Sequence, residues 1–139
     1  MDKRKLFLVL WLFGMLLPLE WLTKAVPWIK RAIDLLMGSE LAHVIGHLVL
    51  FGGLVLLLVH IFRLPLTWKT ALLMAFSVLA VGFGQEFLQL QVKGRSFDWP
   101  EVFDLGVDLT GAALGWLLYQ RLLRYSRYLR IAYFILRGA

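Results

Sequence analysis

The chain contains no cysteine among its 139 residues, and only 17% of its residues are charged. The lack of cysteine excludes disulfide bonds, thiolate catalysis and thiolate metal sites, and it leaves the redox compartment open. The low charge accompanies a hydrophobic fraction of 60% and a mean hydropathy of +0.76. This composition excludes a small soluble domain, because one such core cannot hide so much apolar surface. The folded chain therefore needs lipid as its solvent.

Four hydrophobic runs are each long enough to cross a bilayer, whose hydrocarbon core takes about 20 helical residues. They cover residues 6–22, 41–62, 70–90 and 102–123. We therefore expect an all-α membrane protein, with a single transmembrane domain over residues 1–139. Its fold is predicted to be a compact bundle of about four transmembrane helices with short interfacial helices.

Two further segments have the pattern of interfacial helices. Between Pro27 and Gly38, apolar residues recur at helical spacing beside charged ones. Arginines recur every third residue at positions 121, 124, 127 and 130, among tyrosines and apolar residues. This second pattern predicts a basic amphipathic tail over residues 124–139 on the inner leaflet. The first hydrophobic run follows basic residues but lacks a small-x-small cleavage site, so we expect an uncleaved anchor.

The basic residues also predict an orientation. Of the 15 Lys and Arg residues, ten lie at the N-terminus, in the loop after the second run and in the tail. The other two loops carry the remaining five. The positive-inside rule therefore places both termini in the cytoplasm. The net charge of +6 is accordingly expected to meet anionic membrane lipids and not nucleic acid.

Polar side chains inside the runs gather toward one end. Each ionisable group costs about 2.5 to 3.5 kcal/mol at mid-bilayer unless it finds a partner or water. The residues concerned are His43 and His47 in the second run, Gln85, Glu86 and Gln89 in the third, and Asp104 and Asp108 in the fourth. Both histidines share a helix face, as do both aspartates. Because the second and fourth runs begin where the third ends, we expect one polar pocket at the outer leaflet.

The loop between the last two runs carries Arg95, the nearest strong cation expected for Glu86, Asp104 and Asp108. An arginine fork can bind a carboxylate at two points. Three acids and one arginine give the predicted pocket a net negative charge. This charge would suit a bound cation, shared protons, or a basic or hydroxyl-rich ligand group.

Below the aspartates, Gly111 and Gly115 form a G-x-x-x-G pattern on the same helix face. Such small residues allow another helix to approach closely, so we expect this face to point into the bundle. Matching small surfaces are provided by Gly46, Gly52 and Gly53 in the second run and by Gly82 and Gly84 in the third.

Taken together, these residues resemble the VanZ-like family of small bacterial membrane proteins. The resemblance runs from about Glu40 to Leu118. It is carried by His47 with Phe51, Glu86-x-x-Gln89, Gly94-Arg95-Ser96-Phe97 and Asp104-x-x-x-Asp108-x-x-Gly111-x-x-x-Gly115. Asp108 departs from the asparagine that many relatives carry. The resemblance implies a bacterial inner (cytoplasmic) membrane protein of the cell envelope, linked to glycopeptide resistance, but no settled mechanism.

Three interpretations of the polar set stay open. In the first, Glu86, Gln89, Arg95, Asp104 and Asp108 form a network that locks helix packing, in a structural protein with no ligand. In the second, these residues and the two histidines bind an envelope lipid, a cell-wall lipid intermediate or a glycopeptide. In the third, the chain is a membrane-embedded hydrolase or transferase: Glu86, Asp104 or Asp108 is the catalytic base, and Arg95 steadies a phosphate or oxyanion.

The histidine pair has the i, i+4 spacing of metal ligands, and with Asp108 or Glu86 it would complete a nitrogen and oxygen site. No H-E-x-x-H motif surrounds it. We therefore expect His43 and His47 to be core or interface residues, with no metal and no cofactor. The oligomeric state is not predicted.

Overall fold

A computed structural model describes residues 2–18, 26, 28, 30–31, 33 and 38–137, with side chains as far as Leu123 and at Tyr125. The long helices in this part are α1 (Lys3–Leu16), α4 (Glu40–Phe62), α5 (Trp68–Lys93) and α6 (Trp99–Arg137). No strand occurs among the described residues, which confirms the all-α prediction. The interfacial helix predicted between Pro27 and Gly38 lies mostly outside them.

Capping residues in the sequence mark several of the helix ends. The Ser39 hydroxyl accepts from the backbone N–H of Ala42 at 3.1 Å and starts α4. At the start of α6, the backbone N–H of Asp98 donates to the Glu101 carboxylate at 2.9 Å, as in a capping box. Helix α5 ends at Lys93. The next residue, Gly94, has a φ of 64°, which lies in the left-handed region that glycine adopts without strain.

Helix α1 ends earlier than the first hydrophobic run. Its last residue is Leu16, and Leu17 is extended with φ −70° and ψ 119°. Pro18 explains this end, because proline disfavours helical backbone in the residue before it. With 14 residues, α1 is about 21 Å long, which is less than the hydrocarbon core of about 30 Å.

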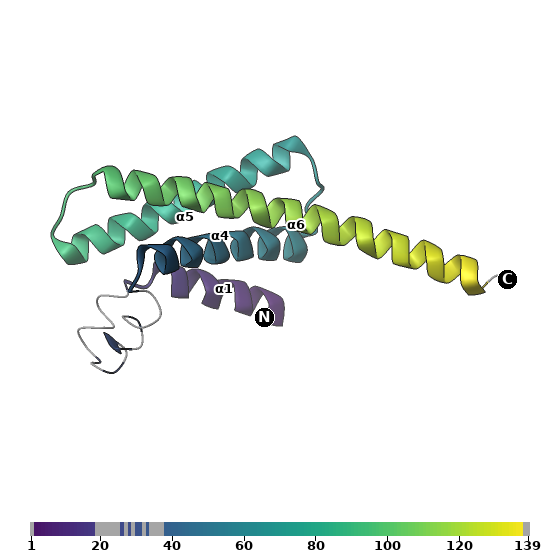
Figure 1. The fold of residues 1–139 in the computed structure, drawn as a ribbon, viewed down its shortest axis with the longest axis horizontal. Coiled ribbons are helices and arrows are strands. Elements are labelled where there is room, and N and C mark those ends of the chain that lie inside the picture. Colours follow the sequence, from purple (N-terminus) through teal and green to yellow (C-terminus); the bar gives the residue numbers. More distant parts are fainter. Residues whose placement is uncertain are drawn as a thin grey trace.

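Three helices are long and apolar enough to cross a membrane: α4, α5 and the Trp99–Leu123 part of α6. They correspond to the second, third and fourth hydrophobic runs. The first predicted span continues past Pro18 into residues that are not described, so a fourth crossing stays a prediction. Helix α6 continues through residue 124 without a break, and Figure 1 shows its C-terminal half projecting beyond the other helices.

Helices α4 and α6 form the most extensive pair in the bundle and lie side by side in Figure 1. Glycines allow this approach. A Cβ atom on Gly111 would lie 2.8 Å from the backbone oxygen of Leu48, and one on Gly115 would overlap the backbone oxygen of Gly52. The face predicted from the G-x-x-x-G spacing therefore packs against α4.

Helix α1 packs on the other side of α4, where it contributes buried Leu8 and Met15 to the core and an aromatic side chain to the contact. The indole Nε1 of Trp11 donates to the backbone oxygen of Leu50 at 3.2 Å. The same ring lies over Gly53, where a Cβ atom would come within 2.7 Å of it. Gly52 and Gly53 thus allow α6 to pack on one side of α4 and α1 on the other.

Candidate functional site

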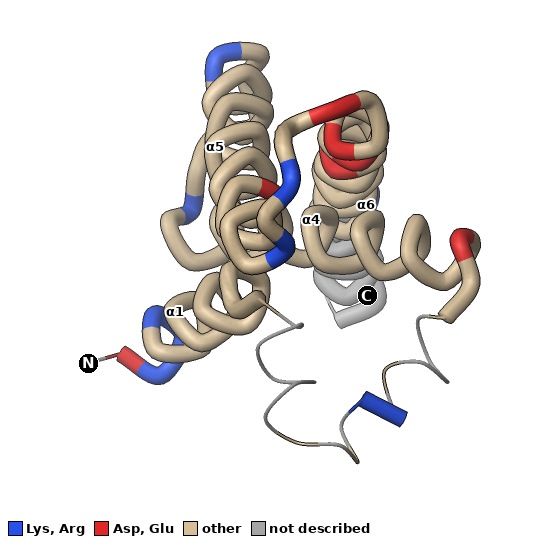
Figure 2. The backbone as a smooth tube through the Cα atoms, turned by 90° about the vertical axis from the view of Figure 1, so that its left-hand side faces the viewer, with Lys and Arg blue, Asp and Glu red and all other residues tan. Residues whose placement is uncertain are grey.

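The polar residues of α4, α5 and α6 meet at one end of the bundle, which we call the histidine end. Helices α4 and α6 begin there and α5 ends there (Figure 1). Figure 2 looks onto this end and shows acidic residues grouped at the start of α6. The predicted meeting of the three helices at one depth is therefore seen in the structure.

His47 and Asp108 form the innermost contact of the site. Nδ1 of His47 lies 2.7 Å from Oδ1 of Asp108, and the two side chains are 6% and 0% exposed. When Asp108 is ionised it can only accept hydrogen bonds, and Nδ1–H of His47 is then the donor. This contact fixes the orientation of the imidazole and leaves its Nε2 atom available.

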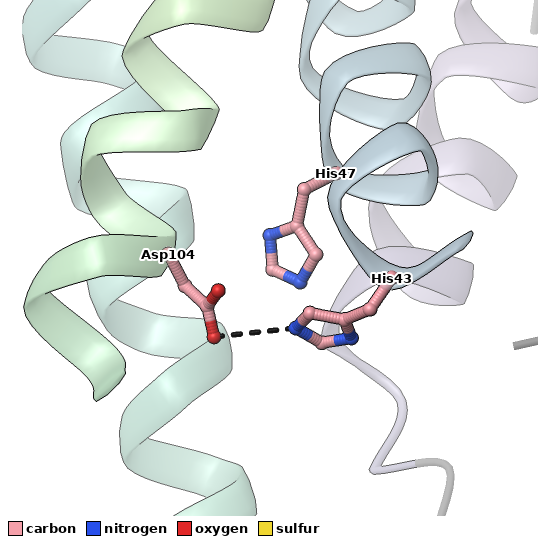
Figure 3. Close-up of side chains that lie close together, drawn as sticks. All are labelled: His43, His47 and Asp104. Carbon is pink, nitrogen blue, oxygen red and sulfur yellow. Dashed lines mark hydrogen bonds and ion pairs between the residues drawn. The ribbon is translucent and has the colours of Figure 1, made fainter. Parts of the chain in front are cut away.

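A second histidine and aspartate pair lies one helical turn closer to the helix ends. Nε2 of His43 lies 3.3 Å from Oδ2 of Asp104, with side chains that are 48% and 15% exposed. The rings of His43 and His47 are neighbours, with centroids 4.5 Å apart. Figure 3 shows both rings on α4 facing Asp104 on α6. Four of the predicted site residues therefore form two parallel pairs between the same two helices.

The carboxylate of Asp108 is held against α5 as well. A Cβ atom on Gly82 would lie 2.5 Å from Oδ2 of Asp108, so only glycine leaves room for this oxygen. Within the described part of the chain, Oδ2 of Asp108 and Oε1 of Gln85 are buried without a hydrogen-bond partner. A buried polar atom without a partner costs free energy.

Glu86 lies beside these pairs but is not joined to them by a hydrogen bond or ion pair. It is buried, and it is close enough to Asp104 and His47 for their charges to interact. Gln89 lies farther out, where its side-chain oxygen accepts from Nζ of Lys93 at 3.3 Å. The predicted set is thus divided between a buried centre and a more exposed rim.

The expectation that Arg95 would compensate the acids was wrong. Arg95 is exposed, and no ion pair joins it to Glu86, Asp104 or Asp108, all of which are described. Histidines take its place as partners of the two aspartates. The reason is positional: Arg95 follows the end of α5 in the connecting loop, whereas both histidines project from α4 toward α6.

A groove of about 790 Å³ opens between the beginnings of α4 and α6. Its lining combines polar and apolar side chains: Ser39, Glu40, Leu41, His43, Val44, Trp99, Pro100, Phe103 and Asp104, with Gly38. Sequence reasoning missed the aromatic wall. Its signal was the i, i+4 spacing of Trp99 and Phe103, both of which come just before Asp104 in the sequence.

No family model, curated protein or solved structure matches the chain. The VanZ-like resemblance therefore stays a prediction from the residues quoted above. Chemically, the arrangement provides an oriented imidazole, a second imidazole beside it, and carboxylates on the facing helix. Two of these groups, His43 and Asp104, line a groove with an apolar wall.

Proposed function

We propose that this chain is a cell-envelope membrane protein that binds an envelope lipid or a lipid-linked cell-wall intermediate at the histidine end. The observation that carries the proposal is the mixed lining of the groove. His43 and Asp104 offer polar partners to a headgroup, while Trp99 and Phe103 offer an apolar wall to an acyl or isoprenoid chain. A volume of about 790 Å³ lies within the range of about 300 to 1,000 Å³ typical of ligand pockets.

The position of the groove supports a lipid in particular. It lies at the ends of two helices that are long and apolar enough to span a membrane. A ligand there would meet both headgroups and hydrocarbon, as a lipid does. The proposal includes a four-helix crossing of the bacterial inner membrane with both termini cytoplasmic, and a contribution to glycopeptide resistance, as the VanZ-like resemblance implies.

The hydrolase or transferase alternative has less support. In this alternative, Arg95 stabilises a phosphate or oxyanion next to the acids. In the structure, however, Arg95 forms no ion pair with these acids. Lipid binding needs only the groove and its lining. It is therefore the function that the geometry supports best.

The test is lipid retention. Wild-type protein and the Phe103→Ala and Asp104→Asn variants would be purified in mild detergent, and the lipids retained would be quantified by mass spectrometry. We expect a specific lipid class to be enriched by the wild type and reduced several-fold in both variants, because each loses one side of the groove. Phe76→Ala is the matched control, since Phe76 is an exposed phenylalanine on α5 outside this lining.

Equal retention by wild type, Phe103→Ala and Asp104→Asn would show that any bound lipid lies elsewhere. Absence of an enriched class in the wild type would also oppose the proposal. A Phe76→Ala protein that loses lipid as Phe103→Ala does would show a general loss of surface hydrophobicity instead of a groove.

A further inference from the structure

His43, His47 and Asp104 bring three metal-ligand atoms together, and two of these residues, His43 and Asp104, line the groove. One ligand atom from each side chain lies within 4.8 Å of the other two. Two of these side chains come from one face of α4 and the third from the facing side of α6 (Figure 3). The sequence had led us to expect no metal, because the two histidines lack the motif that usually accompanies such a pair.

The hydrogen bonds around the cluster suit metal binding. Nδ1 of His47 lies 2.7 Å from the Asp108 carboxylate, which is itself fully buried. Figure 3 shows the other ring nitrogen of His47 pointing toward the space between His43 and Asp104. A carboxylate behind a ligating histidine is the usual arrangement at zinc sites, where it fixes the tautomer and makes the imidazole a better ligand.

We propose that His43, His47 and Asp104 bind a divalent transition-metal ion, with zinc as the best fit, and that Asp108 is the positioning residue behind His47. Two imidazoles and one carboxylate form the ligand class of zinc sites that keep an open position. In a tetrahedral site with bonds of about 2.1 Å, ligand atoms lie about 3.4 Å apart. The 3.3 Å between Nε2 of His43 and Oδ2 of Asp104 already matches this spacing.

The remaining coordination position faces the groove, because His43 and Asp104 both line it. Water or an oxygen atom of a ligand, such as a phosphate oxygen, would complete the coordination there. His43 is about half exposed, so an ion has a path to the site from the surface. The metal site goes beyond lipid binding and does not depend on it.

The test uses the full chain, purified in detergent without a polyhistidine tag, stripped with EDTA and titrated with Co²⁺. The visible absorption of bound Co²⁺ reports coordination, and displacement by Zn²⁺ ranks the two ions. Because the chain has no cysteine, thiolates cannot contribute to the signal. We expect saturation at one Co²⁺ per chain and displacement by Zn²⁺.

Single substitutions distinguish the proposed metal ligands from residues that do not bind the ion. His43→Ala and Asp104→Asn should each weaken Co²⁺ binding at least ten-fold. His43→Ala should fold like the wild type, because the His43 side chain is half exposed. Asp108→Asn should weaken it by about 10- to 100-fold, the effect typical of losing such a carboxylate. His60→Ala is the matched control: His60 is the only other histidine and lies near the opposite end of α4, so binding should match the wild type.

Wild-type protein that binds no Co²⁺ would overturn the proposal. So would His43→Ala and Asp104→Asn proteins that bind it as tightly as the wild type, or a His60→Ala protein that loses binding. The titration is made without added lipid, and lipid retention is measured in EDTA. Failure of metal binding is thereby distinguished from failure of the proposed lipid function.

Discussion

At the residue scale, the contact between His47 and Asp108 is the most deeply buried polar interaction of the site. The two atoms lie 2.7 Å apart with almost no exposure of either side chain. Burying such a pair adds little net stability, because both groups lose their water. Removing one partner is costly, because the other is then left buried and uncompensated.

This asymmetry predicts strong coupling between His47 and Asp108. His47→Gln and Asp108→Asn should each lower the free energy of unfolding by about 3 kcal/mol, because each leaves a buried partner without its hydrogen bond or charge. The double variant should lose clearly less than the sum. Unfolding in detergent, followed by circular dichroism, measures all four proteins.

Arg95→Ala is the control for the same experiment. Arg95 is exposed and has no ion pair with the acids, so its removal should change the free energy of unfolding by no more than about 0.5 kcal/mol. Strictly additive effects of His47→Gln and Asp108→Asn, or a large effect of Arg95→Ala, would contradict the pairing seen here.

At the scale of elements, glycines set how closely the helices approach the site. Gly52 and Gly111 let α4 and α6 approach with backbone against backbone. On the other side of α6, Gly82 of α5 leaves room for the Asp108 carboxylate. The polar pairs therefore depend on helix packing that small residues alone permit.

Gly82→Ala should lower the free energy of unfolding by about 1 to 3 kcal/mol, the usual cost of overpacking, because its Cβ atom would lie 2.5 Å from Oδ2 of Asp108. Gly84→Ala, two residues along the same helix, is the control. Its Cβ atom would meet only Leu16, at an ordinary distance of 3.8 Å, so alanine's better helix propensity should leave stability equal or higher. Thermal unfolding of both variants makes the comparison, and equal melting temperatures would argue against the contact.

Sequence alone predicted the helical elements well but not the partners within the site. The run at 41–62 corresponds to α4 at Glu40–Phe62, and the glycine spacing identified the face of α6 that packs on α4. Charge alone favoured Arg95 as the partner of the acids. Which side chains pair depends on how α4 and α6 are rotated about their own axes. This rotation could not be predicted from a single sequence. The predicted end of the last span near residue 123 agrees with the apolar part of α6, Trp99–Leu123, although the helix itself continues to Arg137.

At the scale of the whole molecule, the two ends of the bundle differ in chemistry. The histidine end holds the paired histidines and aspartates together with the groove. The opposite end holds the beginning of α1 with Lys3, Arg4 and Lys5, and the connection between α4 and α5 with Arg63 and Lys69. The paired histidines and aspartates therefore lie at the opposite end of the bundle from these five basic residues.

This separation predicts that the histidine end faces outward and the basic end faces the cytoplasm, since the cytoplasmic side of membrane proteins is enriched in Lys and Arg. The chain has no native cysteine, so single cysteines introduced at Ser96 and Ser126 would be the only thiols. Ser96 is exposed in the loop between α5 and α6, and position 126 lies in the part of α6 beyond its apolar span. On intact cells, a membrane-impermeant thiol reagent should label Ser96→Cys and spare Ser126→Cys, whereas permeabilised cells should show labelling of both. The reverse pattern on intact cells would place the groove on the cytoplasmic side, and any lipid bound there would then come from the inner leaflet.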